Sequence, residues 1–160
     1  IEEFGKRFNL PYTILRFGSL YGPRSQEWNG LFRYVKEVVE QKKLIYRGTG
    51  KERREYIHVD DAARLSVEIL NQDYKNKAIT VTGNQILNSE ELVDMIFEIA
   101  GVEKNVEFSS DNVSQDHYRM TPYRYKPKKA IKIVPTQYID LGQGILEIVA
   151  EVTDSKDIKE

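Results

Sequence analysis

The sequence has 160 residues, enough for one domain with a real core, and a net charge of −1 that argues against a general nucleic-acid binder. Its composition is 40% hydrophobic and 31% charged, and no apolar run approaches the roughly 20 residues that a membrane helix needs. The absence of cysteine excludes a disulfide scaffold and a cysteine-based metal or nucleophile site, and no secretory signal opens the chain, so we expect a cytoplasmic protein.

The start of the chain predicts the end of a helix followed by a buried strand. Residues 1–8 keep apolar side chains at helical spacing, with no capping residue before them. Pro11 disfavours helical geometry in the residue before it. Residues 12–17 are β-branched and aromatic with little polar alternation, which indicates a strand inside a parallel sheet. Residues 18–24 predict a loop, and open α/β sheets bind ligands at such strand ends.

Further helices are indicated by apolar residues at helical spacing. They are expected over residues 31–40, 62–70, 89–100 and from 141 onward. The first has the stripe Leu31, Val35, Val38 and Val39, and the last has Ile145, Leu146, Val149 and Val152. Asp60, Asn88 and Asp140 suit the N-caps, because their side-chain oxygens can accept orphan amide protons. Glu91 can reach back to complete a capping box at Asn88, and Gly101 can end that helix.

Short runs rich in β-branched and aromatic residues predict the remaining strands. They are expected at 44–46, 54–59, 78–83, 106–108 and 131–134. Residues 25–29 form a polar linker, and residues 109–132 are polar, tyrosine-rich and interrupted by Pro122 and Pro127, so we expect irregular structure there.

Residues 54–61 combine a guanidinium with a strand that leads into a capped helix. Strand alternation places Ile57 and Val59 on one face and Arg54, Tyr56 and His58 on the other. A guanidinium fork can bond two oxygens of a diphosphate at once, which gives Arg54 a candidate role in binding phosphate. His58 has no carboxylate partner in view and is interpreted as structural.

This octapeptide resembles the R-D-Y-I-H-V-x-D signature of extended short-chain dehydrogenase/reductases that act on nucleotide sugars, in which the arginine clamps the diphosphate. Residues 15–23 match a second pattern of that family, L-R-x-x-N-x-Y-G-P, which follows the catalytic Tyr-x-x-x-Lys helix. The resemblance implies an α/β fold, the C-terminal part of a Rossmann-like enzyme with a small α/β substrate-binding lobe. It also implies NAD as cofactor and a nucleotide-diphosphate sugar as partner.

In the family, the Tyr-x-x-x-Lys pair lies just upstream of a segment like residues 1–8, and the Gly-rich dinucleotide fingerprint lies far upstream. We therefore expect roughly the C-terminal half of such an enzyme, inactive alone and with NAD bound mainly by the other half. The resemblance implies three parts: a remnant of the cofactor domain at 1–24, a substrate-binding lobe at 25–153 and a frayed tail at 154–160. The full-length enzyme is expected to be a homodimer. This chain is expected to self-associate, because a bare apolar strand edge invites pairing.

The resemblance assigns binding roles to ten residues and catalytic or metal-binding roles to none. The cofactor side has Phe17 and Gly18. The substrate side has Ser19, Gly30, Leu31, Phe32, Tyr46, Arg47, Arg54 and Arg119. Ser19 replaces the usual asparagine of the family and can still donate one hydrogen bond, while Tyr46 could stack on a base. Leu31 and Phe32 also suit a core role, and the pattern around Arg119 departs from the commoner R-x-G-D form.

Three classes of function stay open. The first is the substrate half of an NAD-dependent nucleotide-sugar epimerase or dehydratase. The second is a non-catalytic module that binds nucleotide sugars or phosphate. The third is a nucleic-acid-binding domain that uses the basic residues 124–129 of the tyrosine-rich loop, which the slightly acidic chain disfavours. The resemblance names neither the sugar nor the choice between epimerase and dehydratase.

Overall fold

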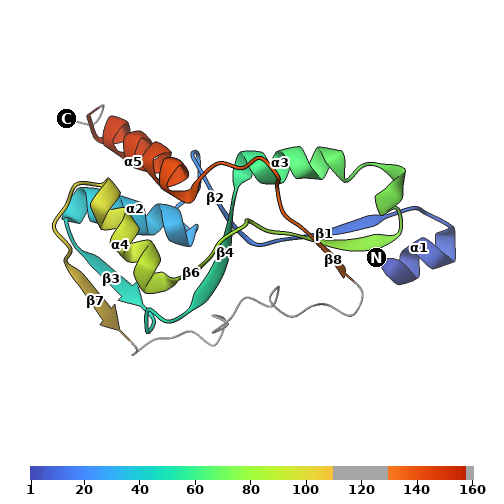
Figure 1. Ribbon diagram of the computed structural model, residues 1–160, viewed down its shortest axis with the longest axis horizontal. Helices are drawn as coiled ribbons and strands as arrows, with labels where there is room; N and C mark the ends of the chain where they lie inside the picture. The colour runs from blue at the N-terminus through green and yellow to red at the C-terminus, as the bar shows by residue number, and fades with distance from the viewer. Residues whose placement is uncertain (110–129, 158–160) are drawn as a thin grey trace.

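The computed structural model of the protein describes residues 1–109 and 130–157. A parallel sheet forms one end of the molecule, in the order β1 (Thr13–Phe17), β5 (Lys77–Val81), β8 (Ala130–Ile133). Helix α3 (Val59–Glu68) lies along this sheet (Figure 1). Apolar side chains of β5, of α3 with its C-cap residue and of the neighbouring strand segment 53–58 share one core: Ile57, Ala62, Leu65, Ile69, Ile79 and Val81. The α/β class and the parallel sheet expected from the sequence are confirmed.

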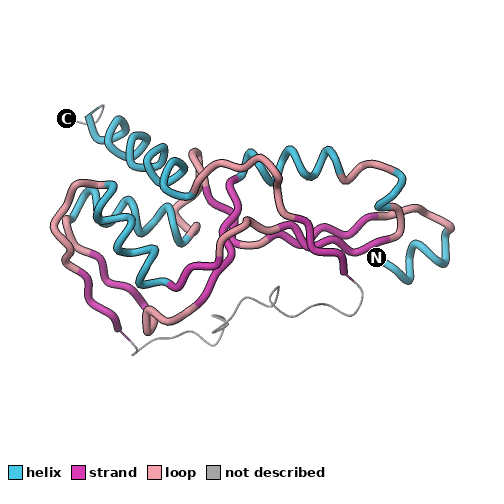
Figure 2. Tube along the Cα trace, in the orientation of Figure 1, coloured by secondary structure: helices cyan, strands magenta, loops and turns pink. Residues whose placement is uncertain are grey.

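Three strands connect this sheet to the rest of the molecule (Figure 2). Strand β4 (Arg53–His58) is central, with β2 (Ser19–Tyr21) parallel on one side and β6 (Ile86–Asn88) antiparallel on the other. The loop predicted over residues 18–24 is wrong for Ser19–Tyr21. These three residues pair in register with Tyr56–His58, and a partner so distant in the chain leaves no local signal.

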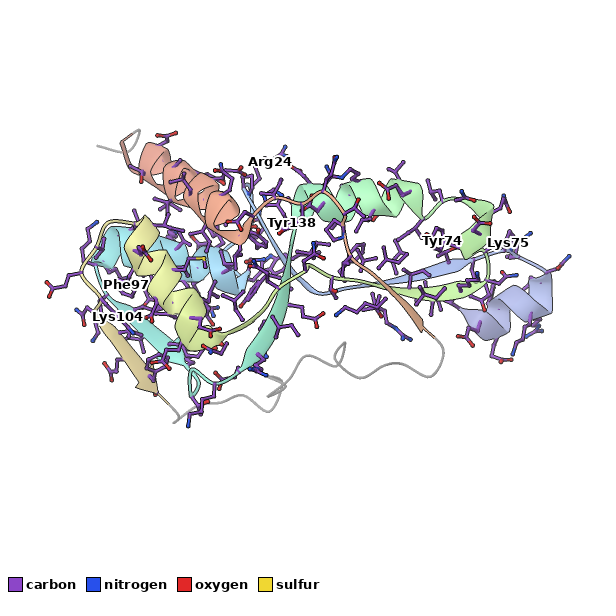
Figure 3. The ribbon with its side chains drawn as sticks, viewed as in Figure 1. Arg24, Tyr74, Lys75, Phe97, Lys104 and Tyr138 are labelled. Atoms are coloured by element: carbon purple, nitrogen blue, oxygen red, sulfur yellow. The ribbon has the colours of Figure 1, made fainter. Side chains whose placement is uncertain are left out.

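The other end of the molecule is a helical lobe. Its helices are α2 (Gly30–Gln41), α4 (Ser89–Ile99) and α5 (Leu141–Asp157), and its parallel strand pair is β3 (Leu44–Arg47) with β7 (Val106–Ser109). Phe97 of α4, labelled in Figure 3, belongs to the core that these elements share. The predicted stripe of α2 is confirmed, because all four of its residues are buried. The division of the chain into parts at residue 24 stays a prediction.

The termini of helices show which local predictions were right. The capping box at Asn88 is confirmed: Asn88 Oδ1 accepts from the Glu91 amide at 2.8 Å, and Glu91 Oε2 accepts from the Asn88 amide at 2.9 Å. The N-cap predicted at Asp60 is wrong. The N-cap of α3 is His58, whose Nδ1 accepts from the Asp60 amide at 3.2 Å, so the helix begins at Val59.

Two predicted faces also differ from the structure. Val59 is 38% exposed, because it opens a helix instead of continuing the strand, and Glu55 joins Ile57 on the buried side of β4. On α5, Leu146 is exposed and Ile148 is buried, so the apolar face is rotated from the one predicted. Helix α5 continues to Asp157 and so includes residues 154–157, which the sequence analysis assigned to a frayed tail.

The remaining elements are short. Helix α1 (Glu2–Phe8) has no buried residue, and a 3₁₀ turn (Gln72–Tyr74) precedes β5. Within residues 1–109 and 130–157, no helix has the length and apolar character needed to cross a membrane.

Strand β1 gives rise to a prediction about self-association. Among the described strands only β5 pairs with it, so β1 forms an edge of its sheet. Unpaired main-chain groups on a strand edge can pair with another chain. We expect the scattering mass of the protein to rise with concentration. Ile14→Lys on β1 should reduce this rise, because charge on an edge strand opposes pairing, whereas Val67→Lys on the exposed side of α3 should not. A constant monomer mass at high concentration would contradict the prediction.

Candidate functional site

A cavity of about 880 Å³ lies between β2, the start of α2, the end of β3 and β4. Its size is typical of pockets that hold small molecules or cofactors. Three cationic side chains line it: Arg47, Lys51 and Arg54. Four aromatic side chains also line it: Trp28, Tyr34, Tyr46 and Tyr56. This combination of positive charge and planar rings suits an anionic ligand that also has a flat, apolar part.

Six residues to which the sequence analysis assigned substrate binding line this cavity. They are Ser19, Gly30, Leu31, Tyr46, Arg47 and Arg54. They come from four elements that are separate in the sequence and meet only through the pairing of β2 with β4 and the packing of α2. The structure therefore places them around one space, while their binding roles stay predictions.

The other predicted residues lie elsewhere. The side chain of Phe32 packs against the core of the lobe, and Phe17 packs against the core of the parallel sheet. A Cβ atom at Gly18 would lie 2.7 Å from the carbonyl oxygen of Glu55, so this glycine allows β1 to approach β4 closely. Arg119 lies outside the described residues, as does the basic run 124–129.

Arg54 is placed by the alternation of strand β4. Glu55 and Ile57 face the interior at 2% and 1% exposure, whereas Arg54 and Tyr56 line the cavity. The predicted opposition of Ile57 and Arg54 is confirmed. Arg54 is half-buried, and its Nη1 donates to the carbonyl oxygen of Arg53 at 3.1 Å. A half-buried guanidinium interacts more strongly with an anion than one in open solvent does.

A buried polar network forms one wall of the cavity. The hydroxyl of Tyr46 donates to Ser89 Oγ at 2.6 Å, and Ser89 Oγ donates to the carbonyl oxygen of Glu52 at 3.1 Å. Glu52 Oε1 accepts from both the amide and the hydroxyl of Thr49, each at 2.8 Å. These bonds fix the turn between β3 and β4, which carries Lys51 and directly follows Arg47, the last residue of β3.

Burial and hydrogen bonding set the charge states in this network. Burial raises the pKa of Tyr46, and the hydrogen bond with Ser89 offsets part of that rise, so the phenol stays neutral. For Glu52, burial alone would raise the pKa. The hydrogen bonds from Thr49, from the backbone of Glu52 and from Tyr46 together outweigh burial and hold the pKa of this carboxyl below its ordinary value.

The geometry gives Tyr46 no exposed ring face for stacking. The side chain is 5% exposed, and its ring lies between those of Tyr34 and Phe108, with centroid distances of 5.3 Å and 5.6 Å. A base stacked on Tyr46 would have to displace one of these rings. Tyr46 therefore lines the cavity with little of its surface exposed.

His58 is buried and caps a helix, but the expectation that it has no carboxylate partner is wrong, because its Nε2 lies 3.4 Å from Glu147 Oε2. Its side chain is fully buried, its Nδ1 caps α3, and its ring packs edge-on against Tyr21 at 5.3 Å. It does not line the large cavity. Within the part of the chain that the structure describes, no group of three or more potential ligand residues could hold a metal ion.

The sequence analysis missed several residues of the cavity wall: Trp28, Tyr34, Thr49, Lys51, Glu52 and Tyr56. The sequence did indicate Trp28 as a candidate binding residue, because it is the only tryptophan of the chain and lies in a polar segment just before a helix. Glu52 had no such signal, because its burial depends on contacts made by the folded turn.

Comparison with known proteins identifies similar sequences. The model of the NAD dependent epimerase/dehydratase family matches residues 1–88. The chain is 25% identical over 107 residues to the uncharacterized UDP-glucose epimerase YtcB of Bacillus subtilis, covering 66% of this chain and 34% of that protein. It is 25% identical over 142 residues to a dTDP-glucose 4,6-dehydratase of Streptomyces griseus, covering 88% of this chain and 42% of the relative.

Solved structures share the fold. A UDP-glucuronic acid 4-epimerase from Bacillus cereus, in complex with UDP-glucuronic acid and NAD, aligns with a TM-score of 0.78 at 21% identity. A dTDP-glucose 4,6-dehydratase from Bacillus anthracis, in complex with NAD, aligns with a TM-score of 0.75 at 22% identity. These alignments cover 96% and 98% of this chain but only 48% and 49% of the respective structures. The chain thus spans half or less of the length of the relatives it matches.

The network at Glu52 predicts a pH-dependent contribution to stability. Because the pKa of Glu52 is lowered on folding, its contribution is present above the ordinary value of 4.5 and is lost as pH falls through the lower folded value. Glu52→Gln keeps an acceptor but loses the charge, so near neutral pH it should lower the free energy of unfolding by about 1 kcal/mol. Urea titrations at several pH values measure this difference.

The difference between wild type and Glu52→Gln should shrink in acid, since the wild-type carboxyl becomes protonated. Glu107→Gln is the matched control, because Glu107 pairs with Lys43 at the surface and its side chain is 61% exposed. A Glu52→Gln effect that is independent of pH would contradict the assigned charge state.

Proposed function

This chain belongs to the NAD dependent epimerase/dehydratase family, because the family model matches more than half of its residues. We propose that the chain forms the part of a nucleotide-sugar epimerase or dehydratase that binds the nucleotide sugar. The observation that carries this proposal is the position of Arg54, which the family signature assigns to diphosphate binding, in the wall of a cavity of ligand size. The curated relatives named above have UDP-glucose or dTDP-glucose in their names, which supports this ligand class.

In this proposal, each part of the cavity wall has a separate task. Arg54 binds the diphosphate through its guanidinium fork. Gly30 and Leu31 lie in the first turn of α2, where amide groups without intrahelical partners can donate to phosphate oxygens. Ser19, at the start of β2, donates a hydrogen bond to the sugar nucleotide. The buried network around Glu52 keeps Arg47 and Lys51 at the cavity edge, where they add positive charge.

The described residues fit a position beside NAD, the cofactor of the family. Phe17 and Val81 are register partners at the carboxyl ends of the parallel strands β1 and β5. Open α/β sheets bind dinucleotides at this edge. We propose that Phe17 and Gly18 border the cofactor there, with most of the binding made by a segment that this chain does not contain. When bound there, NAD would supply the reversible hydride chemistry of the family, and the role of Phe17 and Gly18 would be to border it.

The sequence supports the expectation that the chain alone does not catalyse the reaction. It has no Gly-rich fingerprint of the dinucleotide-binding type. Tyr125 and Lys129 have the spacing Tyr-x-x-x-Lys, but Pro127 between them opposes the helix on which the catalytic pair of the family lies, and all three are outside the described residues.

The first prediction of this proposal concerns the isolated 160-residue chain. It should show no turnover of UDP-glucose or dTDP-glucose and no tight NAD binding, because it lacks the fingerprint and the helical Tyr/Lys pair. Calorimetry with NAD and a coupled assay for sugar products measure the two properties. Micromolar NAD binding by this chain would contradict the assignment of cofactor binding to another segment.

The second prediction concerns Arg54. Arg54→Ala should weaken binding of UDP-glucose or dTDP-glucose by about 1.5–3 kcal/mol, because a charge-assisted bidentate contact is lost. This corresponds to about 10- to 150-fold in affinity. Arg54→Lys should recover only part of the loss, since an ammonium cannot reproduce the guanidinium fork. Titration calorimetry and the melting temperature should be measured on the same samples.

Arg53→Ala is the matched control, because Arg53 is the neighbouring arginine on β4, is exposed and does not line the cavity. It should leave nucleotide-sugar affinity unchanged. If Arg54→Ala lowers the melting temperature sharply while affinity holds, Arg54 is a structural residue and the proposed function loses its main support.

A further inference from the structure

We infer that Trp28 is the platform on which the base of the nucleotide stacks, an inference that rests on the proposed function. Trp28 lines the cavity and is nevertheless 81% exposed. A large apolar ring left in water at the mouth of a cavity has a face available for a planar ligand. Base–aromatic stacking is a general means of binding nucleotides and tolerates different bases, because every base has a π-face.

The other aromatic side chains of the cavity have their rings engaged. Tyr46 is buried between two rings, as described above. Tyr34 packs against Tyr46 on one side, and the guanidinium of Arg33 lies 5.5 Å from its ring centroid. Tyr56 is half-buried and packs edge-on with Tyr21, with ring centroids 6.2 Å apart. Of the aromatic residues in the described cavity wall, Trp28 has by far the most accessible ring.

The backbone that carries Trp28 is held in place on both sides. The Asn29 side chain donates from Nδ2 to the carbonyl oxygen of Leu20 on β2 at 2.9 Å. Its Oδ1 accepts from the amide of Phe32 in α2 at 3.2 Å. On the other side, Glu27 forms an ion pair with Lys36 of α2. A ring presented by a fixed backbone loses less conformational entropy on binding than a ring on a mobile loop would.

The cavity thus separates two kinds of chemistry. Cations supplied by β3, β4 and the turn between them suit the diphosphate, whereas Trp28 on the segment before α2 suits the apolar face of the base. A ligand that spans the cavity would contact both the cations and the Trp28 ring. Variants at Trp28 and at Arg54 should therefore respond differently to ligands with and without a base.

The experiment compares UDP with inorganic pyrophosphate as probes of the isolated chain, using calorimetry and tryptophan fluorescence. Trp28 is the only tryptophan, so any change in tryptophan fluorescence reports on this side chain directly. UDP should quench the fluorescence more than pyrophosphate does. Trp28→Leu should weaken UDP binding about 5- to 150-fold, as expected for the loss of one stacked base. It should leave pyrophosphate binding unchanged, and Trp28→Phe should give an intermediate loss.

Arg54→Ala is the companion variant and should weaken both probes. Phe4→Leu is the control for removal of an exposed aromatic ring. Phe4 is 61% exposed on α1, away from the cavity, so this variant should bind both probes normally.

Equal UDP affinity in wild type and Trp28→Leu would overturn the role of Trp28 while the proposed function stands. Equal loss for UDP and pyrophosphate in Trp28→Leu would also overturn it, since the change would then act on the cavity as a whole. If wild type binds neither UDP nor a nucleotide sugar, both this inference and the proposed function fail.

Discussion

The structure depends on the close approach of the parallel sheet to strand β4. A Cβ atom at Gly83 would lie 1.8 Å from the carbonyl oxygen of Tyr56, and one at Gly18 would lie 2.7 Å from that of Glu55. No side chain fits at these distances, so the two glycines let the ends of β1 and β5 rest on the backbone of β4. Because β4 also carries Arg54, this contact sets the position of the guanidinium relative to the carboxyl edge of the sheet.

Two acidic residues of the octapeptide 54–61, Glu55 and Asp61, hold the two ends of the molecule together. Glu55 is buried and forms an ion pair with Lys132 of β8, at 2.8 Å between Oε2 and Nζ. Asp61 is buried as well, and its Oδ2 accepts from the amide of Ile139 at 2.9 Å, just before α5. A buried carboxylate is costly without such partners. The octapeptide therefore has two functions in the fold: its acids connect distant segments, while Arg54 faces the cavity.

The comparisons show how much sequence can vary around this arrangement. An epimerase structure at 21% identity still aligns with a TM-score of 0.78, because a fold depends more on apolar side chains of suitable size and pattern than on their identity. The cavity wall is a different matter, since single residues there decide which ligand chemistry is recognised. In this chain that wall combines Arg47, Lys51 and an exposed Trp28 with the signature arginine.

Features that depend on near neighbours in the chain could be predicted from the sequence. The apolar stripe of α2 and the capping box of Asn88 and Glu91 were predictable, because each involves residues within a few turns of one helix. The short signature around Arg54 likewise indicates the family from sequence alone, because its residues are contiguous in the chain. Tertiary structure alone decided that β2 is a strand, that His58 rather than Asp60 caps α3 and that the ring of Tyr46 is buried. The pairing of β2 and the burial of Tyr46 depend on segments far apart in the chain, and the His58 ring that makes the local cap packs against Tyr21 of β2. Local sequence carries no information about which distant partner will lie alongside.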